Sequence, residues 1–272
     1  MTLPAERVRA LRVLHDVANG AGWRCVLIGA SVPALLVSSG SPSRVTFDAD
    51  TIVSTRTWDD YEALRRALET RGFRRGAPHQ MFSPEDARID LIPFGPGIVD
   101  ANQIAWPDGW RMSALGLAEA LETAEPSMIE GAFTFDVVPQ STFVLLKLIS
   151  YQDRPEERHR DVADIVAICE AYESDSDRRY EAVGEMVDGV PVSFDLAGAF
   201  ALGRDLRAIA HRDSLEATAK FFARIPDQYA APVRHVVMEE KRTFVGDERR
   251  PQVFRLFRVL QAGIGLRSSP PA

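Results

Sequence analysis

Hydrophobic and polar positions recur with two different periods along the chain, and the change of period divides the sequence into two parts. Up to about residue 138, short apolar runs and alternating positions predict strands with helices between them. The expected strands are 24–28, 44–53, 79–82, 87–93 and 132–138. From Pro139 onward apolar residues fall almost entirely at helical spacing, so strands come first and helices follow.

Helices are expected wherever apolar residues fall three and four positions apart. The first helix carries Val8, Leu11, Leu14 and Val17 on one face. The others are expected at 32–37 after Ser31, at 58–71 after the cap Thr57, and at 141–152, 156–172, 178–187, 194–211, 215–225 and two more segments up to Gly263. Asp213 with Glu216 fits a capping box for one of these helices. The segment 95–126, rich in Gly, Pro and Trp, is expected to be irregular.

This order of elements predicts an α+β fold, in which a small mixed sheet flanked by helices is followed by an α-helical C-terminal domain. A chain of 272 residues is long enough for two modest domains. We expect residues 1–140 to form the α+β domain and residues 141–265 the helical domain. Residues 266–272 are expected to be a disordered tail, because the last five residues, 268–272, are a low-complexity run of Ser, Pro and Ala.

Composition narrows the classes of function. A net charge of −7 argues against a broad basic surface for nucleic acid, although 32 Lys and Arg residues allow a local basic groove. No apolar run approaches the ~20 residues needed to span a bilayer, and the N-terminus has no signal-peptide pattern. We therefore expect a soluble, cytoplasmic protein without a membrane partner. Cys25 and Cys169 lie in apolar stretches and are expected to be buried thiols.

Two aspartates on one predicted strand, Asp48 and Asp50, are the first candidates for chemistry. One residue separates them, so both side chains project from the same face, roughly 7 Å apart at the backbone. Asp90 lies in the middle of another predicted strand. Three mid-strand carboxylates are costly to bury unless a cation compensates them, and such hard oxygen ligands suit Mg²⁺. The alternative, which an Asp-x-Asp pattern alone favours, is a solvent-facing sheet surface.

The turn that precedes these aspartates favours the interpretation as a metal site over that as a solvent-facing sheet surface. The first strand ends in Gly29-Ala30-Ser31 at the start of a helix, where backbone N–H groups and a hydroxyl can bind a phosphate. An ordinary strand–turn–helix has the same pattern. However, the order Gly-Ser turn, helix, Asp-x-Asp strand, helix and single-Asp strand is much less common by chance than any one of its parts.

Other reactive patterns are missing from the sequence. The five histidines are scattered without a His-x-x-x-His spacing, so no zinc site is expected. Ser31 has no nearby His and Asp for nucleophilic catalysis, and no Walker-type Gly-x-x-x-x-Gly-Lys-Ser/Thr run is present. The arginines from Arg65 to Arg75 form either a solvated helix face or part of a groove for an acceptor. Trp106 and Trp110 would stack on a base or, more often, anchor a long loop.

Four segments of the chain are distinctive when taken together: IGAS (28–31), RVTFDADTIV (44–53), IDLIPFG (89–95) and KLISYQDRPEERHRDVADI (147–165). In these segments the chain resembles the AbiEii/AbiGii toxin-like nucleotidyltransferases, which belong to the DNA polymerase β-like nucleotidyltransferase superfamily. The resemblance covers about residues 22–170. It departs from the family at Ala30, where a second Gly is usual, and at Arg160, where the family has Lys.

The resemblance implies a role for each matched residue of the first part. Gly29 and Ser31 would contact the nucleotide phosphates. Asp48 and Asp50 would hold the metal ions. Asp90 would be the third carboxylate, acting as a metal ligand or as a base toward the acceptor hydroxyl.

The same resemblance assigns residues of the helical part. Lys147 would neutralise triphosphate charge as a point cation. Asp161 would shape the nucleotide site, and Asp164, one helical turn further on, is the alternative for that role. The helical domain would therefore contribute Lys147 and Asp161 to the active site.

The activity implied is the Mg²⁺- or Mn²⁺-dependent transfer of a nucleoside monophosphate from a nucleoside triphosphate, such as ATP, to an acceptor hydroxyl on tRNA or protein. The family further implies the toxin of a toxin–antitoxin or phage-defence pair, with an antitoxin protein as a partner. An aminoglycoside-type antibiotic nucleotidyltransferase and a non-catalytic nucleotide-binding relative are the alternatives.

Overall fold

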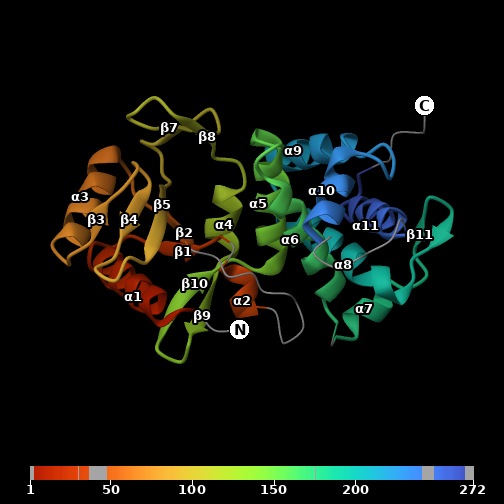
Figure 1. Cartoon of the computed structure of the whole chain (residues 1–272), viewed down its shortest axis with the longest axis horizontal. Helices are drawn as coiled ribbons and strands as arrows, with labels where there is room; N and C mark the ends of the chain where they lie inside the picture. Colours follow the sequence, from red (N-terminus) through yellow and green to blue (C-terminus); the bar gives the residue numbers. More distant parts are fainter. Residues whose placement is uncertain (1–2, 30, 37–47, 175, 241–247, 267–272) are drawn as a thin grey trace. The chain divides into compact units, whose positions relative to one another are not determined.

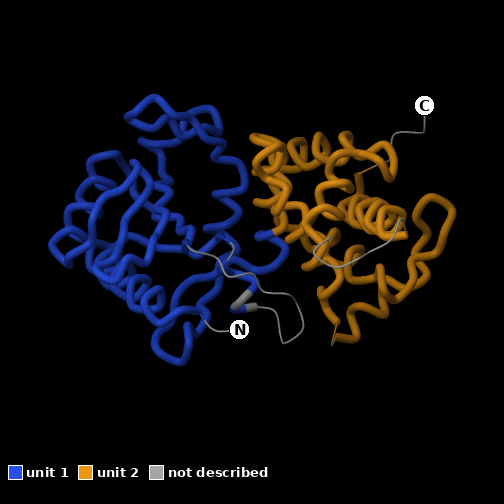
Figure 2. Tube along the Cα trace, viewed as in Figure 1, with its two compact units in different colours: residues 1–143 blue, residues 144–272 orange. Residues whose placement is uncertain are grey.

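The computed structural model describes residues 3–29, 31–36, 48–174, 176–240 and 248–266 (Figure 1). The chain forms two compact units, residues 1–143 and residues 144–272 (Figure 2). Unit 1 contains a mixed sheet with helices, and unit 2 is mainly helical, so the expected α+β fold with a helical C-terminal part is confirmed. In the described part of the chain, every helix is too short or too polar to cross a membrane.

A seven-stranded mixed sheet forms the centre of unit 1, in the order β3-β4-β5-β2-β1-β10-β9. Its strands are β1 (Cys25–Leu27), β2 (Asp48–Val53), β3 (Arg74–Arg75), β4 (Gln80–Phe82), β5 (Arg88–Pro93), β9 (Glu125–Ile129) and β10 (Phe133–Val137). β2 pairs in parallel with β5 and antiparallel with β1. All five strands expected from the sequence are present, and residues 44–47 of the second lie outside the described residues.

Helices α1 (Ala5–Gly20) and α3 (Trp58–Glu69) pack against one another, and α1 also contacts β1 and β5 (Figure 1). The expected cap of α3 is confirmed as a capping box. Asp60 N donates to Thr57 Oγ1 at 3.2 Å, and Thr57 N donates to Asp60 Oδ2 at 3.0 Å. The short helix α2 (Val32–Leu36) follows the Gly-Ser turn, also as expected.

The segment 95–126 is not irregular, so that prediction was wrong. It forms a three-stranded antiparallel sheet of β6 (Val99–Asp100), β7 (Gln103–Ala105) and β8 (Arg111–Ser113), then helix α4 (Leu117–Thr123) and the start of β9. Strands of two or three residues are too short to show an alternating period. Ile104 and Trp106 are both buried and hold this segment to the core of unit 1.

Unit 2 is built mainly from helices. They are α5 (Gln140–Asp153, which begins in unit 1), α6 (His159–Ala171), α7 (Arg178–Glu181), α8 (Phe194–Ile209), α9 (Arg212–Ala223), α10 (Ala231–Glu240) and α11 (Arg249–Gly263). α8 packs on α11 and α6, and α10 packs on α6. At the α8–α11 crossing, a Cβ on Gly203 would lie 2.5 Å from the Leu260 carbonyl oxygen, so this close approach requires glycine.

Two predictions for the helical part were wrong. The helix expected at 178–187 ends at Glu181 and is followed by a hairpin of β11 (Met186–Val187) and β12 (Val190–Pro191). Its turn is Asp188-Gly189, both with positive φ, which is the Asp-Gly signal of a hairpin. The Asp213 and Glu216 capping box is also not formed, because α9 already begins at Arg212 and Glu216 pairs with that arginine at 3.0 Å.

Both cysteines are free and buried, as expected. Burial raises the pKa of the Cys25 and Cys169 thiols, so neither is an activated nucleophile. The domain boundary expected at 140/141 stays a prediction.

Candidate functional site

The three aspartates come together on neighbouring strands of unit 1. In the parallel β2–β5 pair, Asp50 lies directly opposite Asp90, and Asp48 lies opposite Arg88. One carboxylate oxygen from each aspartate lies within 4.8 Å of the other two. Asp90 is only 7% exposed, and Asp48 and Asp50 are half-buried. This group, which we call the aspartate trio, is therefore not an ordinary solvent-facing sheet surface.

Gly29 makes room for one member of the trio. A Cβ at this position would lie 1.7 Å from Asp50 Oδ2, a distance that no side chain tolerates. Ile28 N donates to the Asp50 carbonyl oxygen at 2.9 Å, which holds the end of β1 against β2. The glycine is thus required by the close approach of Asp50, a reason that the sequence alone does not reveal.

Ser31 joins the same turn to the strand that carries the aspartates. The residue is fully buried, and its hydroxyl donates to the Asp48 carbonyl oxygen at 3.2 Å. Val32 N donates to the Gly29 carbonyl oxygen at 2.9 Å. The Ser31 hydroxyl therefore positions Asp48 through its backbone, and a contact of Gly29 or Ser31 with phosphate stays a prediction. Ala30, the departure from the family pattern, lies outside the described residues.

Arg88 is a cation of the site that sequence analysis missed. Its guanidinium binds Asp90 with two hydrogen bonds, one of them from Nε to Oδ1 at 2.7 Å, and its Nη2 lies 3.5 Å from Asp48 Oδ2. The hydrogen bond to Asp90 raises the pKa of Arg88, and Asp48 and Asp50 add to the effect. The buried Arg7 of α1 also interacts electrostatically with Asp48. The sequence did contain a signal for Arg88. It lies two positions before Asp90 on the same predicted strand, so both side chains project from one face.

His79 is a second residue that sequence analysis missed. Its Nε2 lies 3.9 Å from Asp90 Oδ2, and its ring packs against Trp106 and Trp110 at centroid distances of 5.8 and 5.5 Å. Burial lowers the pKa of His79 and outweighs the nearby Asp90, which raises it. The ring is therefore neutral at pH 7. His79 Nδ1 is buried and has no hydrogen-bond partner among the described residues.

The two tryptophans have different surroundings. Trp106 is 2% exposed and packs edge-on against Trp58 and Tyr61 of α3 at 5.5 and 5.9 Å. Such burial supports the role of an anchor for the segment 95–126. Trp110 stacks on Trp106 at 5.8 Å and is only half-buried, so its ring lies nearer the surface beside His79.

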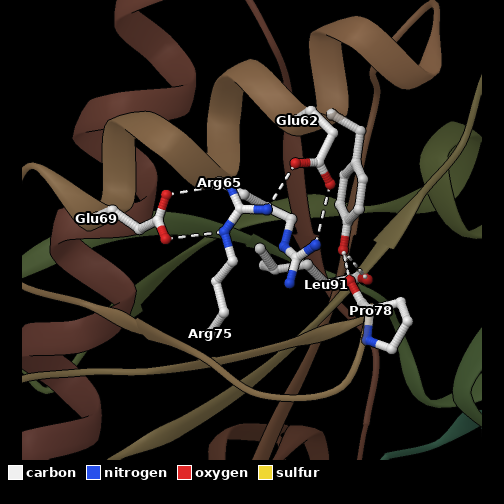
Figure 3. Close-up of polar contacts among 7 residues, drawn as sticks. Glu62, Arg65, Glu69, Arg75, Pro78 and Leu91 are labelled. Carbon is white, nitrogen blue, oxygen red and sulfur yellow. Dashed lines mark hydrogen bonds and ion pairs between the residues drawn. The ribbon is translucent and has the colours of Figure 1, made fainter.

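The arginines near the end of α3 form ion pairs (Figure 3). Arg65 is buried and donates to Glu62 at 3.0 Å, and Arg75 binds Glu62 at 2.7 Å and Glu69 at 2.8 Å. These pairs hold α3 against β3. Because the charges of Arg65 and Arg75 are already compensated by neighbouring carboxylates, the interpretation as a structural helix face is favoured over an acceptor groove.

The predicted residues of the helical part meet in unit 2. Lys147 Nζ lies 2.7 Å from Asp161 Oδ1 and 3.1 Å from Asp164 Oδ2, and Ser150 donates to Asp161 Oδ2 at 2.7 Å. Burial alone would lower the pKa of Lys147, but the two carboxylates outweigh it and the pKa is raised. Lys147 is therefore charged, and both candidate aspartates contact it. Arg160 lies 3.9 Å from Glu239.

The expected site residues thus fall into two groups. Gly29, Ser31 and the aspartate trio gather in unit 1, whereas Lys147, Asp161 and Asp164 gather in unit 2. Each group is compact by itself. That the two groups form one active site stays a prediction.

The aspartate trio fits a divalent cation of the Mg²⁺ type. Its donors are all carboxylate oxygens, which Mg²⁺ and Mn²⁺ prefer, and they already lie within 4.8 Å of one another. At Mg–O distances of about 2.0–2.1 Å, neighbouring ligand oxygens lie about 3 Å apart, so small side-chain rotations suffice. Arg88 compensates Asp90 and Asp48 in the present arrangement, and it would release Asp48 when a metal ion takes over that charge.

The sequence matches no protein-family model and no curated protein, so membership of the AbiEii/AbiGii family stays a prediction. The chain is similar to several solved structures, among them three proteins described in terms of nucleotidyl transfer or nucleotide binding. They are an antigenic nucleotidyltransferase-like protein from Paracoccidioides brasiliensis (TM-score 0.41, 16% identity, 80% of this chain and 94% of that chain), a CCA-adding enzyme in complex with ATP (0.34, 14%, 97% and 68%) and the CD-NTase CdnG of Bradyrhizobium diazoefficiens in complex with GTP (0.29, 15%, 97% and 88%). All three TM-scores lie below 0.5, and the function of this chain is inferred from its own residues.

Proposed function

We propose that this protein is a nucleotidyltransferase, which moves a nucleoside monophosphate from a nucleoside triphosphate to an acceptor hydroxyl and releases pyrophosphate. The observation that carries the proposal is the aspartate trio on β2 and β5, placed beside a turn whose glycine is required by Asp50. A site of only carboxylates, held by two adjacent strands next to a glycine turn, suits a metal-bound triphosphate.

Each residue of unit 1 has a defined task in this proposal. Asp48 and Asp50 would bind Mg²⁺ or Mn²⁺, which when bound neutralises phosphate charge and assists departure of pyrophosphate. Asp90 would accept the proton of the acceptor hydroxyl. Neutral His79, 3.9 Å from Asp90, would orient that carboxylate or receive its proton. Gly29 would leave the backbone N–H groups of its turn open to the phosphates.

Lys147 has two possible tasks. As proposed from the family resemblance, it would bind the triphosphate as a point cation. Its charge is already shared by Asp161 and Asp164, so binding phosphate requires one carboxylate to turn away. The second candidate is a structural role that joins α5 to α6. Lys147→Met distinguishes them, because a raised KM for the nucleotide at unchanged stability supports phosphate binding, and a lowered Tm alone supports the structural role.

The acceptor is found by label transfer. Wild-type protein is incubated with each α-labelled nucleoside triphosphate, Mg²⁺ and total RNA or cell extract. Label in tRNA or in a protein supports the proposed acceptors, and label in a small molecule supports an antibiotic-modifying enzyme. Asp50→Asn should lower transfer by at least about a hundredfold, whereas the exposed Asp59→Asn, outside the trio, should leave it unchanged. Mg²⁺-independent nucleotide binding without transfer would favour a non-catalytic relative.

A toxin role within a toxin–antitoxin or phage-defence pair is the biological part of the proposal, motivated by the family resemblance. Expression of the protein should slow growth, and Asp48→Ala should relieve the effect because it removes a metal ligand. Equal toxicity of wild type and Asp48→Ala would sink the idea. Recovery of a protein partner whose coexpression restores growth would identify the antitoxin.

A further inference from the structure

A second group of metal-ligand side chains lies in unit 2. Glu156 precedes α6, His159 is the first residue of α6, and His235 lies on α10, which packs against α6. One ligand atom from each of the three lies within 4.8 Å of the others. The sequence predicted no zinc site because the histidines are 76 positions apart and meet only through the packing of two helices. All three residues belong to unit 2 and have no part in the proposed function.

The ring of His235 is oriented by a hydrogen bond to a buried tyrosine. Its Nδ1 lies 3.0 Å from the hydroxyl of Tyr151, which is itself 1% exposed and packs edge-on against Phe221 at 5.5 Å. Because the buried tyrosine occupies Nδ1, Nε2 is the ring nitrogen of His235 that remains available to a metal ion. A hydrogen bond of this kind, to the nitrogen that does not bind metal, is the usual way in which a ligating histidine is fixed.

His159 supplies an independent observation. Its Nε2 is buried and has no hydrogen-bond partner in the described part of the chain. A buried ring nitrogen without a partner is unfavourable, so a ligand that accepts its lone pair would remove the deficit. The rings of His159 and His235 lie with centroids 3.7 Å apart and planes tilted by 30°. One nitrogen of each ring could therefore bind the same metal ion.

The donor set indicates the class of ion. Two imidazoles and one carboxylate are the ligands of a zinc-type centre, and imidazole also suits Cu²⁺ and Ni²⁺. The aspartate trio, by contrast, offers only hard oxygens. Tetrahedral ligand atoms at zinc distances of about 2.0–2.1 Å lie about 3.4 Å apart, so the group would contract on binding. Glu156 is exposed and His159 is only half-buried, so rotation of these two side chains would bring their ligand atoms to that distance.

The geometry points to a zinc-type metal site formed by Glu156, His159 and His235, with the fourth position open to water. The ion would join the start of α6 to α10. Since α6 also carries Asp161 and Asp164, which form ion pairs with Lys147 of α5, the ion would help to fix the position of these two aspartates.

Zinc binding to the full-length protein tests this site. Metal-stripped protein is titrated with Zn²⁺ against a chromophoric chelator, with excess Mg²⁺ present to occupy the aspartate trio. The expected result is one Zn²⁺ per chain. Co²⁺ in its place should give the visible absorption of a four-coordinate site.

Variants identify the ligands. His159→Gln and His235→Gln should each weaken zinc binding at least about a hundredfold, and Tyr151→Phe about tenfold or more, because it removes only an orienting hydrogen bond. His15→Gln in unit 1 and Asp50→Asn should keep the wild-type affinity. Circular dichroism checks the fold of each variant. If the substitution of the buried His235 prevents folding, His159→Gln still tests the site, because His159 is only half-buried. Absence of zinc binding tighter than the micromolar range, or full binding by His159→Gln, would overturn the site.

Discussion

Asp50 and Gly29 show how the site depends on single residues. The carboxylate of Asp50 lies where the side chain of any other residue at position 29 would be. Arg88 and His79 then complete the surroundings of the trio on the Asp90 side, one as a compensating cation and one as a neutral ring. The chemistry proposed for the trio therefore rests on close contacts of three neighbouring strands, β1, β2 and β5.

Gly29→Ala should weaken Mg²⁺ binding. The added Cβ would displace the Asp50 carboxylate, whose Oδ2 lies 1.7 Å from the Cβ position, so the trio loses one ligand. We expect at least about a tenfold loss of Mg²⁺ affinity by calorimetry. Gly20→Ala is the matched control because nothing lies within 4 Å of its Cβ position. Equal Mg²⁺ affinity in Gly29→Ala and wild type would show that Asp50 is not a ligand.

His79 should make stability depend on pH. Its folded-state pKa is lowered, so the unfolded chain, with a pKa near 6.5, takes up a proton that the folded protein does not. This contribution is complete above about pH 6.5 and is lost as the pH falls below it. With chelator present, the free energy of unfolding between pH 7 and 5.5 should fall more steeply for wild type than for His79→Gln, by up to about 1.4 kcal/mol per pH unit. Parallel pH profiles would contradict the assignment.

At the scale of elements, the long patterns were predictable and the short ones were not. The strands that carry Asp48, Asp50 and Asp90 have six residues each, long enough to be recognised from their apolar residues, and the two-residue spacing of Asp48 and Asp50 places both on one face. The strands of 95–126 have two or three residues and no readable period. His79 could not be placed from sequence, because its contact with Asp90 depends on the antiparallel pairing of β4 with β5.

The α8–α11 crossing gives a prediction for the helical elements. Gly203→Ala would place a Cβ 2.5 Å from the Leu260 carbonyl oxygen, a backbone atom that moves only with its helix. We expect a loss of about 1–3 kcal/mol in unfolding free energy, the usual cost of overpacking. Gly20→Ala, at the end of α1 in open space, should be neutral or slightly stabilising. Chemical denaturation of both variants is the measurement, and an unchanged Gly203→Ala would contradict the close approach.

At the scale of the whole molecule, the two compact units carry three separate groups of charged or metal-ligand residues, one in unit 1 and two in unit 2. The sequence predicted the change from strands to helices, and the structure places the division within α5, since unit 1 ends at residue 143. The aspartate trio belongs to unit 1, and the zinc-type group and Lys147 belong to unit 2. That the aspartate trio and Lys147 belong to one active site is implied by the family resemblance alone, because no local pattern of the sequence encodes contacts between distant segments.

If the units are domains, metal ions should stabilise them separately. In calorimetric unfolding, Mg²⁺ should raise the transition of unit 1 and Zn²⁺ that of unit 2, because each ion binds one folded unit. Asp50→Asn should abolish the Mg²⁺ shift and leave the Zn²⁺ shift, and His159→Gln should do the reverse. A single transition that both ions shift equally would show that the two units unfold as one.

If the aspartate trio supports nucleotidyl transfer, the α-phosphate of the nucleotide must stay with the acceptor and the γ-phosphate must leave. Wild-type protein, Mg²⁺ and acceptor-containing extract are incubated in parallel with α-labelled and γ-labelled nucleoside triphosphate. With wild-type protein, α-label should become attached to an acceptor and γ-label should leave as pyrophosphate, whereas Asp50→Asn should give neither product. Transfer of the γ-label to an acceptor, or equal activity of Asp50→Asn, would contradict nucleotidyl transfer by the trio.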